Sequence, residues 1–235
     1  MDFTPDLVVI GEWGPFRLNA TILWTWVVMA LLAAGSWALA RGLRAGDELS
    51  PGQNLLEAVV ATIETQIRDV GGQDPRPFLP FVGTLFLFIV VSNVLSIVPG
   101  FSPPTGSLST TAALALCVFF AVPIFGIERQ GLRHYLRQYV QPSVVMLPFT
   151  IIGELSRTLA LAVRLFGNVM SGTVIAALLL GVAPLFFPVV MQAFGLLIGV
   201  IQAYIFAILA MVYIASATRV QHDADSSTEG RRAHG

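Results

Sequence analysis

Lysine is absent from this sequence, and charged residues of every kind are scarce. All 13 basic residues are arginine, and Asp, Glu, Lys and Arg together make up 11% of the 235 residues. A soluble domain carries about a quarter charged residues, so this chain has too few charges to cover a water-exposed surface. The net charge of -1 argues against a nucleic-acid partner, which would favour a basic face.

The chain has only one cysteine and no nucleotide-binding motif. The single cysteine, Cys117, cannot form an internal disulfide, and it lies in an apolar run where a packing role is the better interpretation. The chain has no Gly-x4-Gly-Lys loop to hold a phosphate, so we predict no ATPase activity for the chain alone. Nothing in the sequence indicates a metal site or a cofactor.

Long apolar runs make up most of the chain, which is 55% hydrophobic. A spanning helix needs about 20 apolar residues. We predict an all-α integral membrane protein with five membrane-crossing helices, in which the last two runs exceed one span and are therefore tilted or bent. The predicted crossings are residues 20–41, 78–99, 107–128, 143–182 and 186–218.

A different pattern occupies residues 53–71, where apolar side chains recur at helical spacing and Glu57, Glu64 and Arg68 point elsewhere. This predicts an amphipathic helix on the membrane surface or against a partner. An ordinary soluble-type helix in a loop fits the same pattern. No internal repeat is visible.

The distribution of arginine predicts the orientation in the membrane. Arginines follow the first, third and last predicted crossings, and none precedes Arg17. We therefore expect residues 1–19 to form an external tail and residues 221–235 a polar, disordered cytoplasmic tail. The first charges of the chain are acidic, unlike those of a signal peptide, so we expect the first apolar run to stay in the membrane.

Between residues 143 and 218 only three residues carry a charge, and all three fall in one predicted helix: Glu154, Arg157 and Arg164. A central arginine costs at least about 2.5–3.5 kcal/mol on insertion scales, so such residues are usually functional. Glu154 and Arg157 are three positions apart and can neutralise each other, as a functional pair or as mere scaffolding. Arg164 has no acid within one turn and needs an anion from elsewhere, which another subunit can supply. Alternatively, Arg164 pins helices together through carbonyl groups or Glu154.

Several segments together resemble subunit a of F-type ATP synthases. The most specific is Arg164–Asn168 (RLFGN), preceded by Ser156-Arg157 and followed by Gly172; the last helix contributes Ile201–Phe206 (IQAYIF). Further matches are Pro80–Phe86, Ser92-Asn93, Ile97–Gly100, Pro104-Thr105 and Ser109–Thr111, so that the resemblance covers roughly residues 50–220 in order.

The resemblance implies a stator subunit in the membrane sector of a rotary ATP synthase of a bacterial inner membrane. Its partners would be the c-ring, the peripheral-stalk b subunits and the lipid bilayer. The last two helices would lie against the c-ring, and two half-channels would carry H⁺ or Na⁺. Arg164 matches the arginine that faces the c-ring carboxylates, Gln202 matches the glutamine opposite it, and Asn168 matches the polar residue one turn beyond it.

Titratable residues common in proton-translocating relatives are replaced in this chain. Thr173 lies where an acid or histidine is common, Gly195 where a second titratable residue is common, and Thr150 where a glutamate often lies. Neutral groups remain as possible half-channel lining: Thr150, Ser171, Thr173, Gln192 and Asn93. Either protons move through water chains or the ion is sodium. Glu154 with Arg157 resembles the sodium-translocating N-type branch, which favours sodium.

Two other functions compete with this interpretation. A small secondary transporter could bind an anionic substrate at Arg164, although such proteins usually show repeats and paired broken helices. A membrane scaffold without transport is the third possibility, and the intramembrane charges disfavour it.

Overall fold

Six α-helices make up most of the computed structural model, which describes residues 9–13, 16–42, 51–72, 74–98, 100–133, 135, 146–182 and 187–218. Four of these helices are long and apolar enough to cross a membrane, and α3 is a shorter apolar helix. The predicted all-α membrane protein is thereby confirmed. The helices are α1 (Ala20–Gly42), α2 (Pro51–Gly71), α3 (Leu79–Leu95), α4 (Leu108–Gln130), α6 (Met146–Val182) and α7 (Phe187–Thr218), and a 3-10 turn, η2 (Pro104–Gly106), precedes α4.

A short β-hairpin precedes α1. This hairpin was not predicted from the sequence. Strand β1 (Val9–Trp13) pairs antiparallel with β2 (Phe16–Asn19), and Trp13 lies opposite Phe16. Valine, isoleucine, tryptophan and phenylalanine favour strands, and all four occur in these two segments. The all-α description therefore applies to the membrane helices and not to this hairpin.

The helix bounds differ in detail from the expected ranges. The helix expected over residues 78–99 ends at Leu95, because the next amides bond three residues back instead of four: Ser96 to the Asn93 carbonyl and Ile97 to the Val94 carbonyl. Helix α2 begins at Pro51, a favoured first helical position for proline. The tail predicted over residues 221–235, and residues 1–8 of the external tail, lie outside the described residues.

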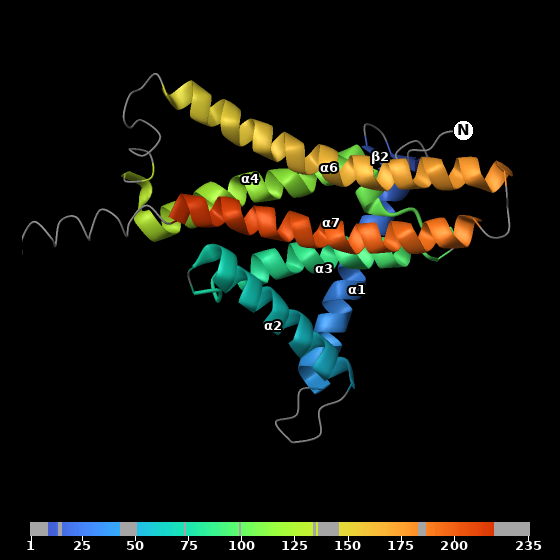
Figure 1. Ribbon diagram of the computed structural model, residues 1–235, viewed down its shortest axis with the longest axis horizontal. Helices are drawn as coiled ribbons and strands as arrows, with labels where there is room; N and C mark the ends of the chain where they lie inside the picture. The colour runs from blue at the N-terminus through green and yellow to red at the C-terminus, as the bar shows by residue number, and fades with distance from the viewer. Residues whose placement is uncertain are drawn as a thin grey trace, which may run out of the picture.

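The helices form a long bundle with two outlying arms (Figure 1). Helices α3, α4, α6 and α7 run along the long axis of the molecule, while α1 and α2 leave this bundle on the α3 side. The first half of α6, drawn in yellow, diverges from α4 and α7. This divergence explains why large apolar side chains there, such as Phe149 and Ile152, are exposed.

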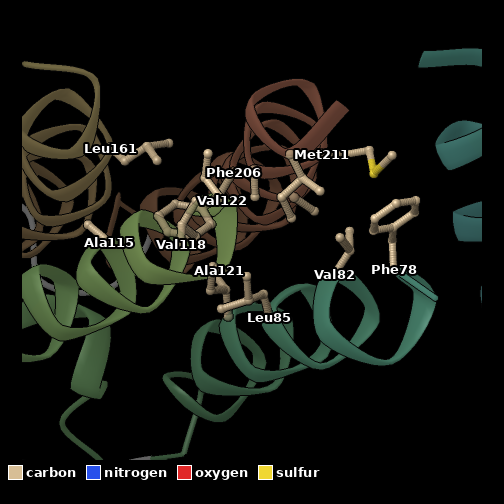
Figure 2. Close-up of a cluster of buried hydrophobic side chains, with 14 of the residues drawn as sticks. Phe78, Val82, Leu85, Ala115, Val118, Ala121, Val122, Leu161, Phe206 and Met211 are labelled. Carbon is tan, nitrogen blue, oxygen red and sulfur yellow. The ribbon is translucent and has the colours of Figure 1, made fainter. Parts of the chain in front are cut away.

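Apolar side chains from four helices meet in the bundle core (Figure 2). Phe78 precedes α3, and Val82 and Leu85 lie on it; Val118 and Val122 come from α4, Leu161 from α6, and Phe206 and Met211 from α7. Alanines fill the closest contacts, and Ala115, Ala203 and Ala210 are fully buried. Small residues let membrane helices approach closely, where packing rather than water exclusion holds them together.

Helix α2 is amphipathic. Its Ile63 and Ile67 are buried against the bundle, whereas Glu57, Arg68 and Asp69 are exposed. A hydrogen bond of 2.8 Å from the Tyr204 hydroxyl to Gln66 Oε1 joins α2 to α7.

Candidate functional site

Arg164 lies on the exposed side of α6, next to the helix face that packs into the core. Leu161, Ala162 and Leu165 are buried, whereas Arg164 is exposed. Within the part of the chain that the structure describes, the guanidinium has neither an ion pair nor a hydrogen bond. The arginine is therefore not pinning helices together through Glu154 or through described carbonyl groups.

The other two intramembrane charges pair with each other. Arg157 Nη1 lies 3.1 Å from Glu154 Oε1, one turn away on α6. The Arg157 guanidinium also lies 5.4 Å from the centre of the Tyr213 ring of α7, a cation–π contact between the two long helices. Glu154 thus neutralises Arg157 locally.

Arg157 and Arg164 share one face of α6, since seven residues make almost two full turns. Arg157 has its counter-charge on the same helix, and Arg164 has none among the described residues. Because a lone guanidinium at membrane depth is costly, the exposed position of Arg164 fits a helix face that another charged protein covers.

Gln202 lies on α7 with its side chain buried, and it carries an unused donor. The residue is 6% exposed, and its Nε2 has no hydrogen-bond partner in the described structure. Buried amide groups are nearly always bonded, so an unpaired one needs an explanation such as a water or a missing partner. No hydrogen bond joins Gln202 to Arg164.

Asn168 is half-buried one turn beyond Arg164, and the remaining predicted site residues lie along both helices. The hydroxyls of Ser171 and Thr173 donate to backbone carbonyls of their own helix, at 3.0 Å and 2.8 Å. Both residues are exposed, and Thr150 is half-buried. Gln192 Nε2 donates to the Ser96 carbonyl at 3.1 Å, which ties the start of α7 to the end of α3.

Asn93 is buried in the contact between α3 and α7. Its Nδ2 donates to the Gly199 carbonyl at 3.0 Å, and its Oδ1 accepts from the Thr105 hydroxyl at 3.1 Å. Sequence reasoning named Asn93 but missed Gly199, Thr105 and the Tyr213 ring. No signal could have found these partners in one sequence, because each contact joins segments far apart in the chain.

An apolar cavity lies apart from these groups. It has a volume of about 210 Å³, lies between α2, α3 and α7, and has no charged residue in its lining. Neither Arg164 nor Gln202 contributes to it, so it is unsuited to an ion path. Among the described residues, no three His, Cys, Asp or Glu side chains group closely enough to hold a metal ion.

Comparison with known proteins decides the family. The family profile described as "ATP synthase A chain" matches residues 22–215. The chain belongs to the ATP synthase subunit a family. It is 60% identical over 230 residues to "ATP synthase subunit a 2" of Acaryochloris marina, covering 97% of this chain and 98% of that one. It is 58% identical over 219 residues to "ATP synthase subunit a" of Albidiferax ferrireducens, covering 93% and 95%.

Membership gives the chain its place in the complex. As a subunit a, it is a multi-pass, non-catalytic membrane subunit of the Fo sector, on the stator side. The family associates with the c-ring and the rest of the synthase. Neither the transporter nor the scaffold alternative gains support from these matches.

Proposed function

We propose that Arg164 is the group that exchanges ions on the c-ring carboxylates, between two half-channels formed with this subunit. The supporting observation is its exposure on α6 without a counter-charge among the described residues, beside an ion pair that satisfies the other two charges of that helix. A c-subunit carboxylate carries its ion through lipid in neutral form and releases it at this face.

Arg164 stabilises the carboxylate that remains after the ion has left. An unpaired buried carboxylate is costly, and two unit charges about 4 Å apart attract by about 4 kcal/mol at an effective dielectric of 20. Arginine suits this task because it stays protonated and is less strongly hydrated than lysine. The same positive charge prevents ions from passing directly between the half-channels.

Gln202 of α7 and Asn168 of α6 assist Arg164 in binding the carboxylate. The unpaired Nε2 of Gln202 is a donor that can hydrogen-bond the carboxylate or the water beside it. Asn168 extends the polar surface one turn along α6. The hydroxyls of Thr150, Ser171 and Thr173 and the amide of Gln192 supply neutral, polar lining for the water-filled part of the path.

Replacing Arg164 tests this role. In the Arg164→Ala variant we expect an assembled complex that makes no ATP from an ion gradient. The matched control is Arg133→Ala, an exposed arginine beyond α4, which should keep normal coupling. Normal ion-driven synthesis by Arg164→Ala would contradict the proposal.

We further propose that the transported ion is sodium rather than the proton. The lining residues are neutral oxygen and amide groups, which can ligate or hydrate a sodium ion but do not titrate. Glu154, the acid on α6, is held by Arg157 at 3.1 Å. Reconstituted complexes should pump only when sodium is present, and sodium-independent pumping would end this proposal.

The orientation and the remaining partners are part of the same proposal. The arginine distribution supports an external N-terminus, a cytoplasmic C-terminus and a bacterial inner membrane. The amphipathic α2, with Ile63 and Ile67 buried and its charges outward, fits the membrane surface. The outlying arms α1 and α2 offer a surface to peripheral-stalk b subunits. In an Arg133→Cys variant, we expect the new cysteine to be labelled only by a reagent added on the cytoplasmic side. Labelling by a reagent added outside would mean that the orientation is the reverse of the one proposed.

A further inference from the structure

A buried polar contact links three segments next to the proposed site. Asn93 of α3 donates to the Gly199 carbonyl of α7 at 3.0 Å and accepts from the Thr105 hydroxyl of η2 at 3.1 Å. Asn93 is 5% exposed and Thr105 is fully buried. The amide has one productive orientation, because turning it over would set its oxygen against the Gly199 carbonyl.

Gly199 allows this contact through its lack of a side chain. A Cβ at this position would lie 2.9 Å from both Cγ and Nδ2 of Asn93. Glycine inside a helix is about 1 kcal/mol less favourable than alanine, so its presence in the middle of α7 has a packing reason. Any larger residue would force the Asn93 side chain out of its bonded position or move α7 away from α3.

The 3-10 turn η2 also packs closely against α6. Gly106 follows Thr105, and a Cβ on Gly106 would lie 3.3 Å from Cγ1 of Val169. Neighbouring residues of one turn therefore contact α3 and α6: Thr105 bonds to Asn93 of α3, which in turn bonds to α7, and Gly106 packs against Val169 of α6.

These contacts lie within one turn of the proposed ion-exchange groups. Gly199 precedes Gln202 by three residues, and Val169 follows Asn168 directly. We propose that Asn93 and Thr105 are positioning residues that set the spacing between Arg164 and Gln202; this inference rests on the proposed function. A displacement of about 1 Å in a reacting geometry can cost roughly 100-fold in rate, so a small shift of α7 should be visible in coupling.

The test measures, in whole ATP synthase reconstituted into vesicles, ATP synthesis per assembled complex and the number of ions pumped per ATP hydrolysed. Gly199→Ala should lower synthesis per complex by about tenfold and also lower the pumping ratio. The matched control is Gly83→Ala, a buried helical glycine of α3 whose new Cβ would meet nothing within 4 Å.

Two further variants separate positioning from simple packing. Thr105→Val keeps the shape of the side chain but removes the hydroxyl that orients Asn93, so it should lower the pumping ratio in a complex that still assembles. The double variant Asn93→Ala with Gly199→Ala should be no worse than Asn93→Ala alone, because Cγ and Nδ2 of Asn93, the two atoms closest to the new methyl, are gone.

A reduced amount of complex with an unchanged pumping ratio would overturn the inference, since the contact would then serve assembly only. Wild-type synthesis and pumping by Gly199→Ala and Thr105→Val would overturn it as well. If these variants are normal while Arg164→Ala is inactive, only the positioning role fails. If Arg164→Ala keeps coupled synthesis, the proposed function itself fails.

Discussion

Glu154 neutralises Arg157 across one turn of α6, with 3.1 Å between carboxylate oxygen and guanidinium nitrogen, while Arg164 on the same face has no counter-charge among the described residues. The helix thus carries one satisfied charge pair and one cation left for a partner. In the function that we propose, this division keeps a second arginine from competing for the carboxylate that the c-ring brings to Arg164.

Removing the Glu154 carboxylate should create that competition. Glu154→Gln frees Arg157 two turns from Arg164, so a c-ring carboxylate would meet two cations and leave more slowly. We expect coupled ATP synthesis to fall by roughly tenfold, which corresponds to a barrier higher by about 1.4 kcal/mol. Adding Arg157→Gln should restore much of the rate. Equal loss in the single and double variants would show that Glu154 acts in some other way.

Gln202→Leu should separate stability from function. Removing a buried, unpaired amide leaves folding unharmed or slightly improved, because no hydrogen bond is broken within the described chain. A hydrogen bond to a charged group contributes about 1.5–3 kcal/mol, so synthesis should fall by roughly 10- to 100-fold. Thermal unfolding and ion-driven synthesis of the purified complex measure the two effects. Met211→Leu, a change of similar volume at a buried position of α7, is the control.

Tyr204→Phe should loosen α2 without stopping transport. The change removes the 2.8 Å hydrogen bond to Gln66 but leaves the ring in the apolar cavity. Such a bond contributes about 0.5–1.5 kcal/mol, and its exposure places this one near the lower end. Amide hydrogen exchange in α2 should become faster in Tyr204→Phe. In the control variant Tyr213→Phe, the exchange rate of the α2 amides should stay unchanged. Unaltered exchange in Tyr204→Phe would mean that apolar contacts alone hold α2.

The charged part of the candidate site could be predicted from sequence because a charge in an apolar run is costly and conspicuous. The spacing of Glu154 and Arg157 predicted their pairing, since residues three apart are neighbours on a helix. The unpaired state of Arg164 followed from the lack of an acid within one turn. These inferences depend on local geometry, which sequence spacing sets directly.

Contacts between distant segments could not be predicted in this way. Asn93 and Gly199 are 106 residues apart, and hydrophobic patterning indicates that a helix is buried but not which helix it meets. The early end of α3 depends on amide bonds to carbonyls three residues back, which an apolar run to Val98 does not indicate. The hairpin at Val9–Asn19 was missed because its short strands precede a dominant apolar helix.

The most direct test of the account is a disulfide between this face of α6 and the c-ring. Ala160 is exposed one turn before Arg164, and exposed Ala113 of α4 is the control position. In a chain with Cys117→Ala, we expect Ala160→Cys to cross-link to a cysteine placed one turn from the c-subunit ion-binding carboxylate, and Ala113→Cys not to do so. Cross-linking at Ala113 but not at Ala160 would place Arg164 away from the ring and contradict the account.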